Sequence, residues 1–205
     1  MFLQRYFTGM TDHQSRRSVP TLLSVFLACG LLVIAAPGKG VVAQPEGVWL
    51  LVDTEALTLS VMEGDSAKRV YRNIAIGSNG PTLNKRRGDG KTPLGDFQVT
   101  HVLSTSRFHL FFGLGYPNRD HARRGFQEGL LGPGDYLEVR RALRTNSVPP
   151  QDTPLGGFIG IHGIGIGDPK IHASFNWTEG CIALTNEQID ELAQWVHVGT
   201  PVTIR

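Results

Sequence analysis

Residues 177–184 read Trp-Thr-Glu-Gly-Cys-Ile-Ala-Leu. It places Cys181 directly after a glycine and before an apolar run. Residues 185–188, Thr-Asn-Glu-Gln, follow with the spacing of a capping box, in which the Thr185 hydroxyl and the Gln188 side chain bond each other's backbone amides. Helical spacing of the apolar residues continues the pattern, so a helix is predicted right after the cysteine segment, with an apolar face of Ile189, Leu192 and Val196.

Upstream, the chain alternates short β-type runs with turn residues, which predicts a mainly β (α+β) domain. Residues 104–134 show no clean period and contain several glycines, so we expect a long lid loop there. The strands are expected at 48–53, 56–62, 69–77, 92–103, 135–139, 157–162 and 201–205.

The first 43 residues have the order of a signal peptide. An uncharged run, 21–36, follows the basic pair Arg16-Arg17, and small residues ending at Ala43 predict cleavage before Gln44. An uncleaved N-terminal anchor is the alternative, because the run is close to the length of a spanning helix. We therefore divide the chain into a leader, 1–43, and a domain, 44–205, exported to the periplasm or cell envelope.

The charge balance of the whole chain is 20 Lys and Arg against 18 Asp and Glu, a net charge of +2. The leader holds four of the basic residues and one acidic residue, so the remaining domain carries −1. That value predicts no nucleic-acid partner and no membrane contact except through an uncleaved leader. A monomer is expected, and the basic residues at 85–87 and 107–144 are interpreted as a solvated rim.

The exported domain keeps a single cysteine, Cys181. An unpaired cysteine in an oxidising compartment is an intermolecular bridge, an inert buried thiol or a nucleophile. His162, at the end of an apolar strand, could serve as its base. From these residues alone, a hydrogen-bonded core histidine and an idle thiol remain an open interpretation. A metal site of His162, His172 and Cys181 lacks any paired ligand motif.

Three segments together resemble the L,D-transpeptidase catalytic (YkuD-like) family. Gly160–Gly163 matches its HG motif, the segment around Cys181 matches S-x-G-C, and Lys91–Phe97 matches T-P-x-G-x-F. The resemblance runs from Trp49 to Val196 in the family's order. Phe108-His109 and residues 116–120 are similar to the branch that processes murein in the bacterial envelope.

The resemblance implies an L,D-transpeptidase-type β-sandwich and a thiol mechanism without cofactor or metal. Cys181 would attack the carbonyl on the L-centre side of an L–D bond in a peptidoglycan stem peptide and form a thioester. His162 would be the base, held by the Gly163 carbonyl, and the Gly180 and Cys181 amides would stabilise the oxyanion. In the lid, the resemblance implies that Tyr116 contacts substrate. Asn118 and Asp120 are further substrate-binding candidates, with a structural turn as the alternative for all three.

Three positions depart from the family pattern. Thr178 replaces the usual serine and keeps a supporting hydroxyl, Glu179 replaces histidine and should oppose thiolate formation, and Ala183 replaces arginine. The last change leaves open whether an amine or water resolves the thioester. The alternatives to a transpeptidase are therefore a hydrolase, an L,D-carboxypeptidase or an amidase that releases a murein-linked protein, and a non-catalytic murein-binding domain.

Overall fold

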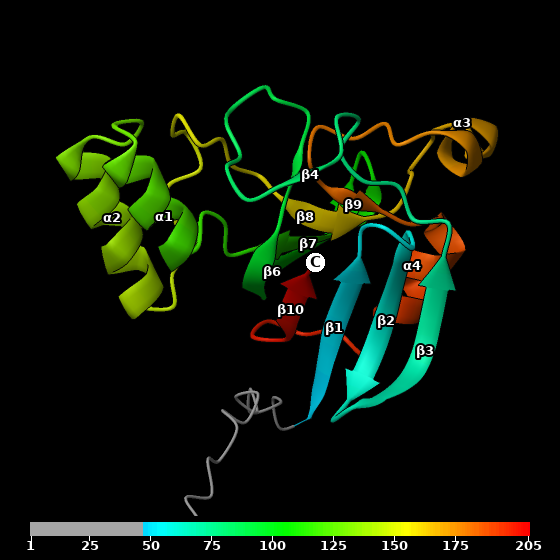
Figure 1. The fold of residues 1–205 in the computed structure, drawn as a ribbon. Helices are drawn as coiled ribbons and strands as arrows, with labels where there is room; N and C mark the ends of the chain where they lie inside the picture. Colours follow the sequence, from blue (N-terminus) through cyan, green and yellow to red (C-terminus); the bar gives the residue numbers. More distant parts are fainter. Residues whose placement is uncertain (1–46) are drawn as a thin grey trace, which may run out of the picture. The chain divides into compact units, whose positions relative to one another are not determined.

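The computed structural model describes residues 47–205, so the predicted leader lies outside the described residues. No helix among the described residues is long and apolar enough to cross a membrane. Figure 1 shows a curved sheet at the centre, with paired helices at one end and a short helix at the other.

The domain is mainly β, as predicted. Eight strands form one mixed sheet in the order β3-β2-β1-β10-β6-β7-β8-β9, and two short strands, β4 and β5, pair separately. The strands are β1 (Val48–Asp53), β2 (Thr58–Glu63), β3 (Ser66–Arg72), β4 (Pro81–Thr82), β5 (Thr92–Pro93), β6 (Gly95–Ser106), β7 (His109–Leu114), β8 (Gly160–His162), β9 (Ile182–Ala183) and β10 (Pro201–Ile204).

The two edges of the sheet are joined. Ala75, which follows β3, exchanges two backbone hydrogen bonds of 2.9 and 2.8 Å with Ala183 of β9. The sheet therefore bends around a shared apolar core, to which strands from both halves contribute, among them Leu50, Val61, Phe112, Ile161 and Ile182.

The predicted helix after Cys181 is α4 (Asn186–Leu192), and its capping box between Thr185 and Gln188 is present. Ile189 and Leu192 are fully buried, so this helix is anchored in the core through its apolar face. Val196 lies beyond the end of the helix and packs against the core from there.

The expected lid loop at 104–134 and the expected strand at 135–139 are both wrong. The region contains the β6–β7 hairpin, α1 (Arg119–Gln127) and the start of α2 (Pro133–Arg144). Helix α1 buries only small or polar residues, so its sequence does not show the helical spacing of apolar residues that would predict it. In α2, the spacing of Tyr136, Val139 and Leu143 follows a helical period that the alternation over 135–139 concealed.

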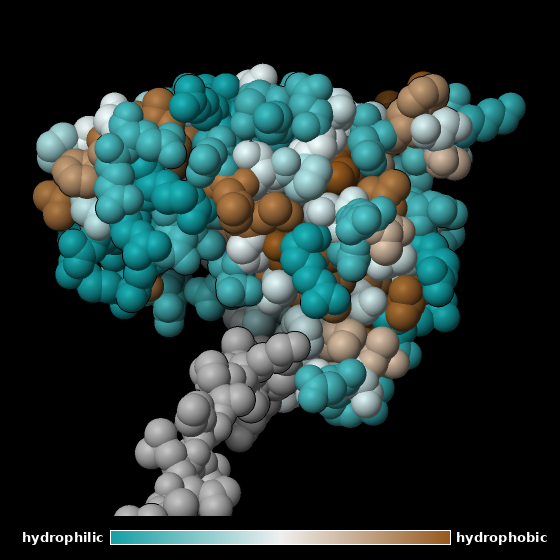
Figure 2. All heavy atoms as spheres, viewed as in Figure 1, coloured by the Kyte–Doolittle hydropathy of each residue, from teal (hydrophilic) through white to brown (hydrophobic). Residues whose placement is uncertain are grey.

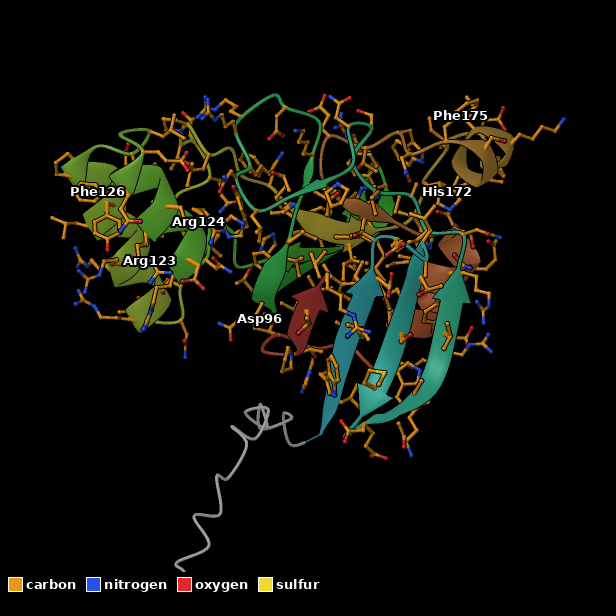
Figure 3. All side chains as sticks on the ribbon, in the orientation of Figure 1. Asp96, Arg123, Arg124, Phe126, His172 and Phe175 are labelled. Carbon is orange, nitrogen blue, oxygen red and sulfur yellow. The ribbon has the colours of Figure 1, made fainter. Side chains whose placement is uncertain are left out.

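The remaining helix, α3 (Pro169–Ser174), lies at the other end of the domain from α1 and α2. Figure 3 shows Arg123 and Phe126 on α1 at one side of the view, and His172 on α3 with Phe175 directly after it at the other side. On the face drawn in Figure 2, hydrophilic side chains cover most of the α1–α2 region, and apolar side chains gather between it and β1–β3. Helices α1 and α2 are thus mostly exposed to solvent on this face, and the strands contribute most of the core residues.

Candidate active site

The pairing of β8 with β9 brings His162 and Cys181 together. Ile161 and Ile182 are partners in this parallel pair, and both are fully buried in the core. Side chains alternate between the faces of a strand, so His162 and Cys181, each one residue away, point to the opposite face. His162 and Cys181 are nineteen residues apart in sequence but lie diagonally across from each other on two neighbouring strands.

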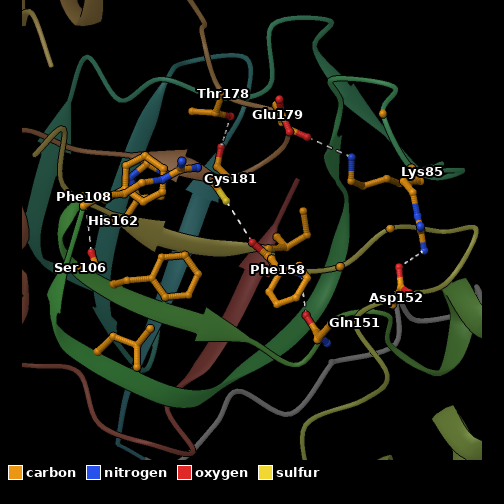
Figure 4. A pocket seen from close by; sticks show the side chains of 18 of the residues that line it. Lys85, Ser106, Phe108, Gln151, Asp152, Phe158, His162, Thr178, Glu179 and Cys181 are labelled. Carbon is orange, nitrogen blue, oxygen red and sulfur yellow. Dashed lines mark hydrogen bonds and ion pairs between the residues drawn. The ribbon is translucent and has the colours of Figure 1, made fainter.

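Both residues line a cavity of about 860 Å³ (Figure 4). Its walls come from the loop before β5, the β6–β7 hairpin, the segment before β8 and the turn before β9, with Lys85, Arg87, Arg107, Phe108, Phe158, Trp177 and Glu179 among the lining residues. A second cavity of about 830 Å³ adjoins it, because Ser106, Arg107, Phe108 and Trp177 line both.

The imidazole of His162 is held in one tautomer. Its Nδ1 lies 2.6 Å from the Gly163 carbonyl oxygen, and because a carbonyl only accepts, Nδ1 carries the hydrogen and Nε2 carries the lone pair. The Phe108 ring stacks on the imidazole with centroids 4.2 Å apart, and the Trp177 ring meets it edge-on at 6.0 Å. The hydrogen bond to Gly163 is the one that the family resemblance implies, and the rings of Phe108 and Trp177 add contacts that fix the orientation of the imidazole.

Burial keeps both reactive groups neutral. Desolvation lowers the pKa of His162 to about 4, against the favourable hydrogen bond to Gly163, and the positive charge of Arg107 lowers it further. Desolvation raises the pKa of the Cys181 thiol to about 11, and the Glu179 carboxylate adds to that rise, as expected. The Gly160 amide and the charges of Lys85 and Arg107 act in the other direction. A neutral thiol beside a neutral imidazole suits proton transfer that accompanies attack, rather than a preformed ion pair.

The thiol donates a hydrogen bond of 3.4 Å to the carbonyl oxygen of Phe158, as drawn in Figure 4. Phe158 has a φ of +56°, an uncommon conformation for a bulky residue, and its amide donates to the Gln151 side chain at 2.6 Å. The hydrogen bond to the Phe158 carbonyl holds the thiol proton on sulfur.

Thr178 supports the turn that carries the nucleophile. Its hydroxyl donates to the Cys181 carbonyl at 2.7 Å and accepts from the Gly180 amide at 3.1 Å. The Gly180 amide is therefore occupied, which corrects the expectation that it is free to bind an oxyanion. Within residues 47–205, the Cys181 amide has no protein acceptor and is the backbone donor that remains for this task.

Lys85 is a site residue that sequence analysis placed in a solvated rim, whereas the structure buries it. Its ammonium group lies 2.7 Å from Asp89 and donates to the Glu179 carbonyl at 3.2 Å, directly before Gly180. The sequence held one signal for this: Asp89, four residues after Lys85, offers the paired charge that a buried lysine requires. Lys85 thus ties the loop before β5 to the turn before Cys181.

The T-P-x-G-x-F segment supports the same turn from outside the cavity. The hydroxyl of Thr92 accepts the Gly77 amide at 2.8 Å, and the next residue, Ser78, donates its amide to the Thr178 carbonyl at 2.9 Å. The carbonyl of Lys91 packs against Gly180. The motif therefore supports the turn before Cys181 and does not line the cavity.

Replacing Gly180 with alanine tests this packing. Gly180 has a φ of +133°, and a Cβ there would lie 2.5 Å from the Lys91 carbonyl oxygen and 3.0 Å from the Lys85 ammonium. We expect Gly180→Ala to displace the cysteine turn, to slow acylation of Cys181 by a β-lactam at least 100-fold, and to lower stability by about 2 kcal/mol. Intact-mass kinetics and thermal unfolding measure the two effects.

Gly199→Ala is the matched control for that variant. Gly199 also has a positive φ, +95°, but a Cβ there meets no atom within 4 Å. It should lose about 1 kcal/mol of stability and keep the wild-type acylation rate. Equal acylation rates in the two variants would show that the contact at Gly180 does not position the nucleophile.

The three residues expected to contact substrate are structural, which is a correction. Tyr116 is fully buried and donates its hydroxyl hydrogen to the Leu155 carbonyl at 2.9 Å. Asn118 caps the N-terminus of α1 by accepting from the His121 amide at 2.9 Å. Asp120 pairs with Arg123 on the surface of α1 at 2.9 Å. Once residues 119–127 form a helix, its cap and its anchor are needed for packing, and none of the three lines the cavity around Cys181.

His172, considered above only as a metal ligand, lies on α3 and accepts a 3.3 Å hydrogen bond from the Trp177 indole. It lines the second cavity, whereas His162 and Cys181 line the first. Within residues 47–205, no group of three or more His, Cys, Asp or Glu side chains is arranged to hold a metal ion.

Known proteins resemble this chain in sequence pattern and in fold. Residues 47–204 match the family described as "YkuD: L,D-transpeptidase catalytic domain". No curated protein sequence matches the chain. Among solved structures, the helical cell shape determining protein Pgp2 from Campylobacter jejuni is similar at 21% identity with a TM-score of 0.54, covering 78% of this chain and 47% of that one.

Two further structures have lower TM-scores. Bd1075 from Bdellovibrio bacteriovorus is similar at 24% identity and a TM-score of 0.47, covering 77% of this chain and 47% of that one. An L,D-transpeptidase from Xylanimonas cellulosilytica is similar at 15% identity and 0.46, covering 79% of this chain and 62% of that one. The chain spans about half the length of the first two structures. With the match over residues 47–204, the chain belongs to the YkuD family of L,D-transpeptidase catalytic domains, whose members act on peptidoglycan.

Proposed function

We propose that this protein is an exported cysteine acyltransferase that breaks L–D peptide bonds in peptidoglycan stem peptides. The observation that carries the proposal is the His162 imidazole, held with its Nε2 lone pair available, on the same sheet face and in the same cavity as the Cys181 thiol. Family membership supplies the substrate class. The expected place of action is the periplasm or cell envelope.

The reaction proceeds in two steps. The Cys181 sulfur attacks the carbonyl carbon of the L-centre residue while its proton passes to Nε2 of His162, and the Cys181 amide faces the oxyanion. The C–N bond then breaks, His162 gives the proton to the leaving amine, and a thioester remains. In the second step an acceptor amine attacks the thioester, His162 takes up the amine proton, and the thiol is regenerated.

The second cavity favours transfer to an amine over hydrolysis. A transferase must place an acceptor chain beside the thioester while the donor is still attached, and the two cavities adjoin along Arg107, Phe108 and Trp177. Water needs no such space. We therefore infer that the protein is a transpeptidase, with stem trimming and release of a murein-linked protein as the hydrolytic alternatives.

Defined muropeptides test the proposal. We expect the purified protein, incubated with tetrapeptide stems and an added D-amino acid, to form exchange products that mass spectrometry identifies. Cys181→Ala is the control and should form none. Shortened stems without exchange would identify a hydrolase, and unchanged stems would favour a non-catalytic murein-binding domain.

A carbapenem tests the nucleophile without any stem peptide. We expect the β-lactam ring to open on the Cys181 sulfur, so that the intact mass rises by one carbapenem and the label maps to the peptide containing Cys181. Cys181→Ala should stay unmodified. A folded wild-type protein with unchanged mass would contradict a working thiol.

A further inference from the structure

Three cationic side chains line the cavity around Cys181, and two of them are already neutralised. Lys85 pairs with Asp89 at 2.7 Å, and Arg87 pairs with Asp152 at 2.6 Å. Arg107 forms no ion pair or side-chain hydrogen bond with any part of the chain that the structure describes. The cavity therefore presents one uncompensated guanidinium to whatever enters it.

Arg107 is held close to the chemistry by the hairpin between β6 and β7. Its guanidinium carbon lies 4.5 Å from the centroid of the Phe108 ring, and that ring stacks on His162. A cation over an aromatic face is attracted to it even where the site is partly exposed. The positive charge of Arg107 also lowers the pKa of both His162 and Cys181, so its field reaches both reactive groups.

A guanidinium at this place is suited to bind a carboxylate. The planar fork of arginine binds a carboxylate through two parallel N–H donors, which gives both energy and orientation. In a stem that ends one residue beyond the scissile L–D bond, only the amide nitrogen and one Cα separate the terminal carboxylate from the carbonyl carbon under attack. That carboxylate must therefore lie beside the reactive groups whenever the bond is in position.

We propose that Arg107 is a specificity-determining residue that binds the free carboxylate of the terminal D-residue of the stem, so that stems ending at that residue are selected for cleavage. This inference rests on the proposed function. It assigns the leaving D-amino acid to the Arg107 side of the cavity and makes stems with a blocked or extended terminus poor substrates.

Matched stem tetrapeptides, one with a free terminal carboxylate and one with a terminal amide, test the assignment. For the wild type, we expect kcat/KM to be about 10- to 100-fold higher on the free acid, the range for one charge-assisted hydrogen-bonded pair. Arg107→Gln should bring the acid-to-amide ratio of kcat/KM close to one, whatever the change in the absolute rates. Arg107→Lys, which keeps the charge but not the fork, should recover part of the preference.

Arg87→Gln is the control for a general loss of positive charge, because Arg87 lines the same cavity but is paired with Asp152. Its acid-to-amide ratio should equal that of the wild type. Equal losses on both peptides for Arg107→Gln, or a wild type that does not distinguish them, would overturn the assignment.

Binding to Cys181→Ala separates this inference from the proposed function. Isothermal titration of the two peptides into Cys181→Ala, with and without Arg107→Gln, measures the carboxylate preference where no bond is broken. A preference of about 10- to 100-fold that disappears with Arg107 supports the assignment even if the wild type turns over no stem. Turnover by the wild type without any such preference would refute the assignment and leave the acyltransferase standing.

Discussion

His162→Gln is expected to lower the rate of stem cleavage roughly 1,000-fold, within the range that a general base contributes. Glutamine can still donate a hydrogen bond to the Gly163 carbonyl but cannot accept the thiol proton. Because burial raises the pKa of Cys181 to about 11, the thiol does not ionise by itself at neutral pH. Turnover of a defined stem peptide at pH 7.5 measures the loss, and circular dichroism checks that the fold is kept.

The control for that variant is His197→Gln, which removes an exposed imidazole near β10, outside the cavity, and should leave turnover unchanged. Turnover within a few-fold of wild type in His162→Gln would remove His162 as the base.

The pH profile of the wild type tests the same role. With the pKa of His162 lowered to about 4, the imidazole is in its basic form from pH 6 to 8, so the rate should be nearly flat there and fall only at lower pH. An acid limb centred near 6.5 would indicate an imidazole that titrates as in water.

Acidification from pH 8 to pH 5 is expected to lower the free energy of unfolding by about 4 kcal/mol. Burial lowers the pKa of both His121 and His162 to about 4, whereas an unfolded chain titrates them near 6.5. Below pH 6.5 the unfolded state therefore binds protons that the folded state does not. Stability is complete above that pH and is lost as the pH falls toward 4, by about 2 kcal/mol per histidine at pH 5.

The surroundings of His121 explain its part of this effect. Its Nδ1 lies 2.6 Å from the Asn118 side-chain oxygen, whose amide nitrogen is committed to the Asp96 carbonyl, so Nδ1 carries the hydrogen. Its Nε2 is buried without a partner among the described residues, and the ring packs against Phe97 and Tyr116. A proton on Nε2 would place an unpaired charge in the core.

Urea unfolding at pH 8, 6.5 and 5 measures the loss of stability. His121→Gln is the matched variant: it should lose the His121 share of the pH dependence, about 2 kcal/mol at pH 5. A free energy of unfolding that stays constant from pH 8 to 5 would show that these histidines remain accessible to protons in the folded state.

Local sequence signals were sufficient where neighbouring residues carry the information. Residues close in sequence were enough to predict the capping box at Thr185 and Gln188 and the strand 48–53. The same holds for the family motifs around His162 and Cys181. The prediction of a lid loop was wrong because the sequence of α1 shows no helical spacing of apolar residues. The prediction that Tyr116 contacts substrate was wrong for a related reason, since a buried tyrosine next to a helix cap resembles a turn residue in the sequence.

By itself the sequence determined the fold class, the family resemblance and the identity of the pair His162 and Cys181, because these depend on motifs and periodicity within short segments. Only the tertiary structure decided the surroundings of that pair. Parallel pairing of β8 and β9 put both side chains on one face, and burial kept them neutral. The Thr178 hydroxyl occupied the Gly180 amide, and long-range contacts buried Lys85, while Arg107 has no ion-pair partner among residues 47–205. Burial depends on residues far apart in sequence, so no local pattern could have shown it.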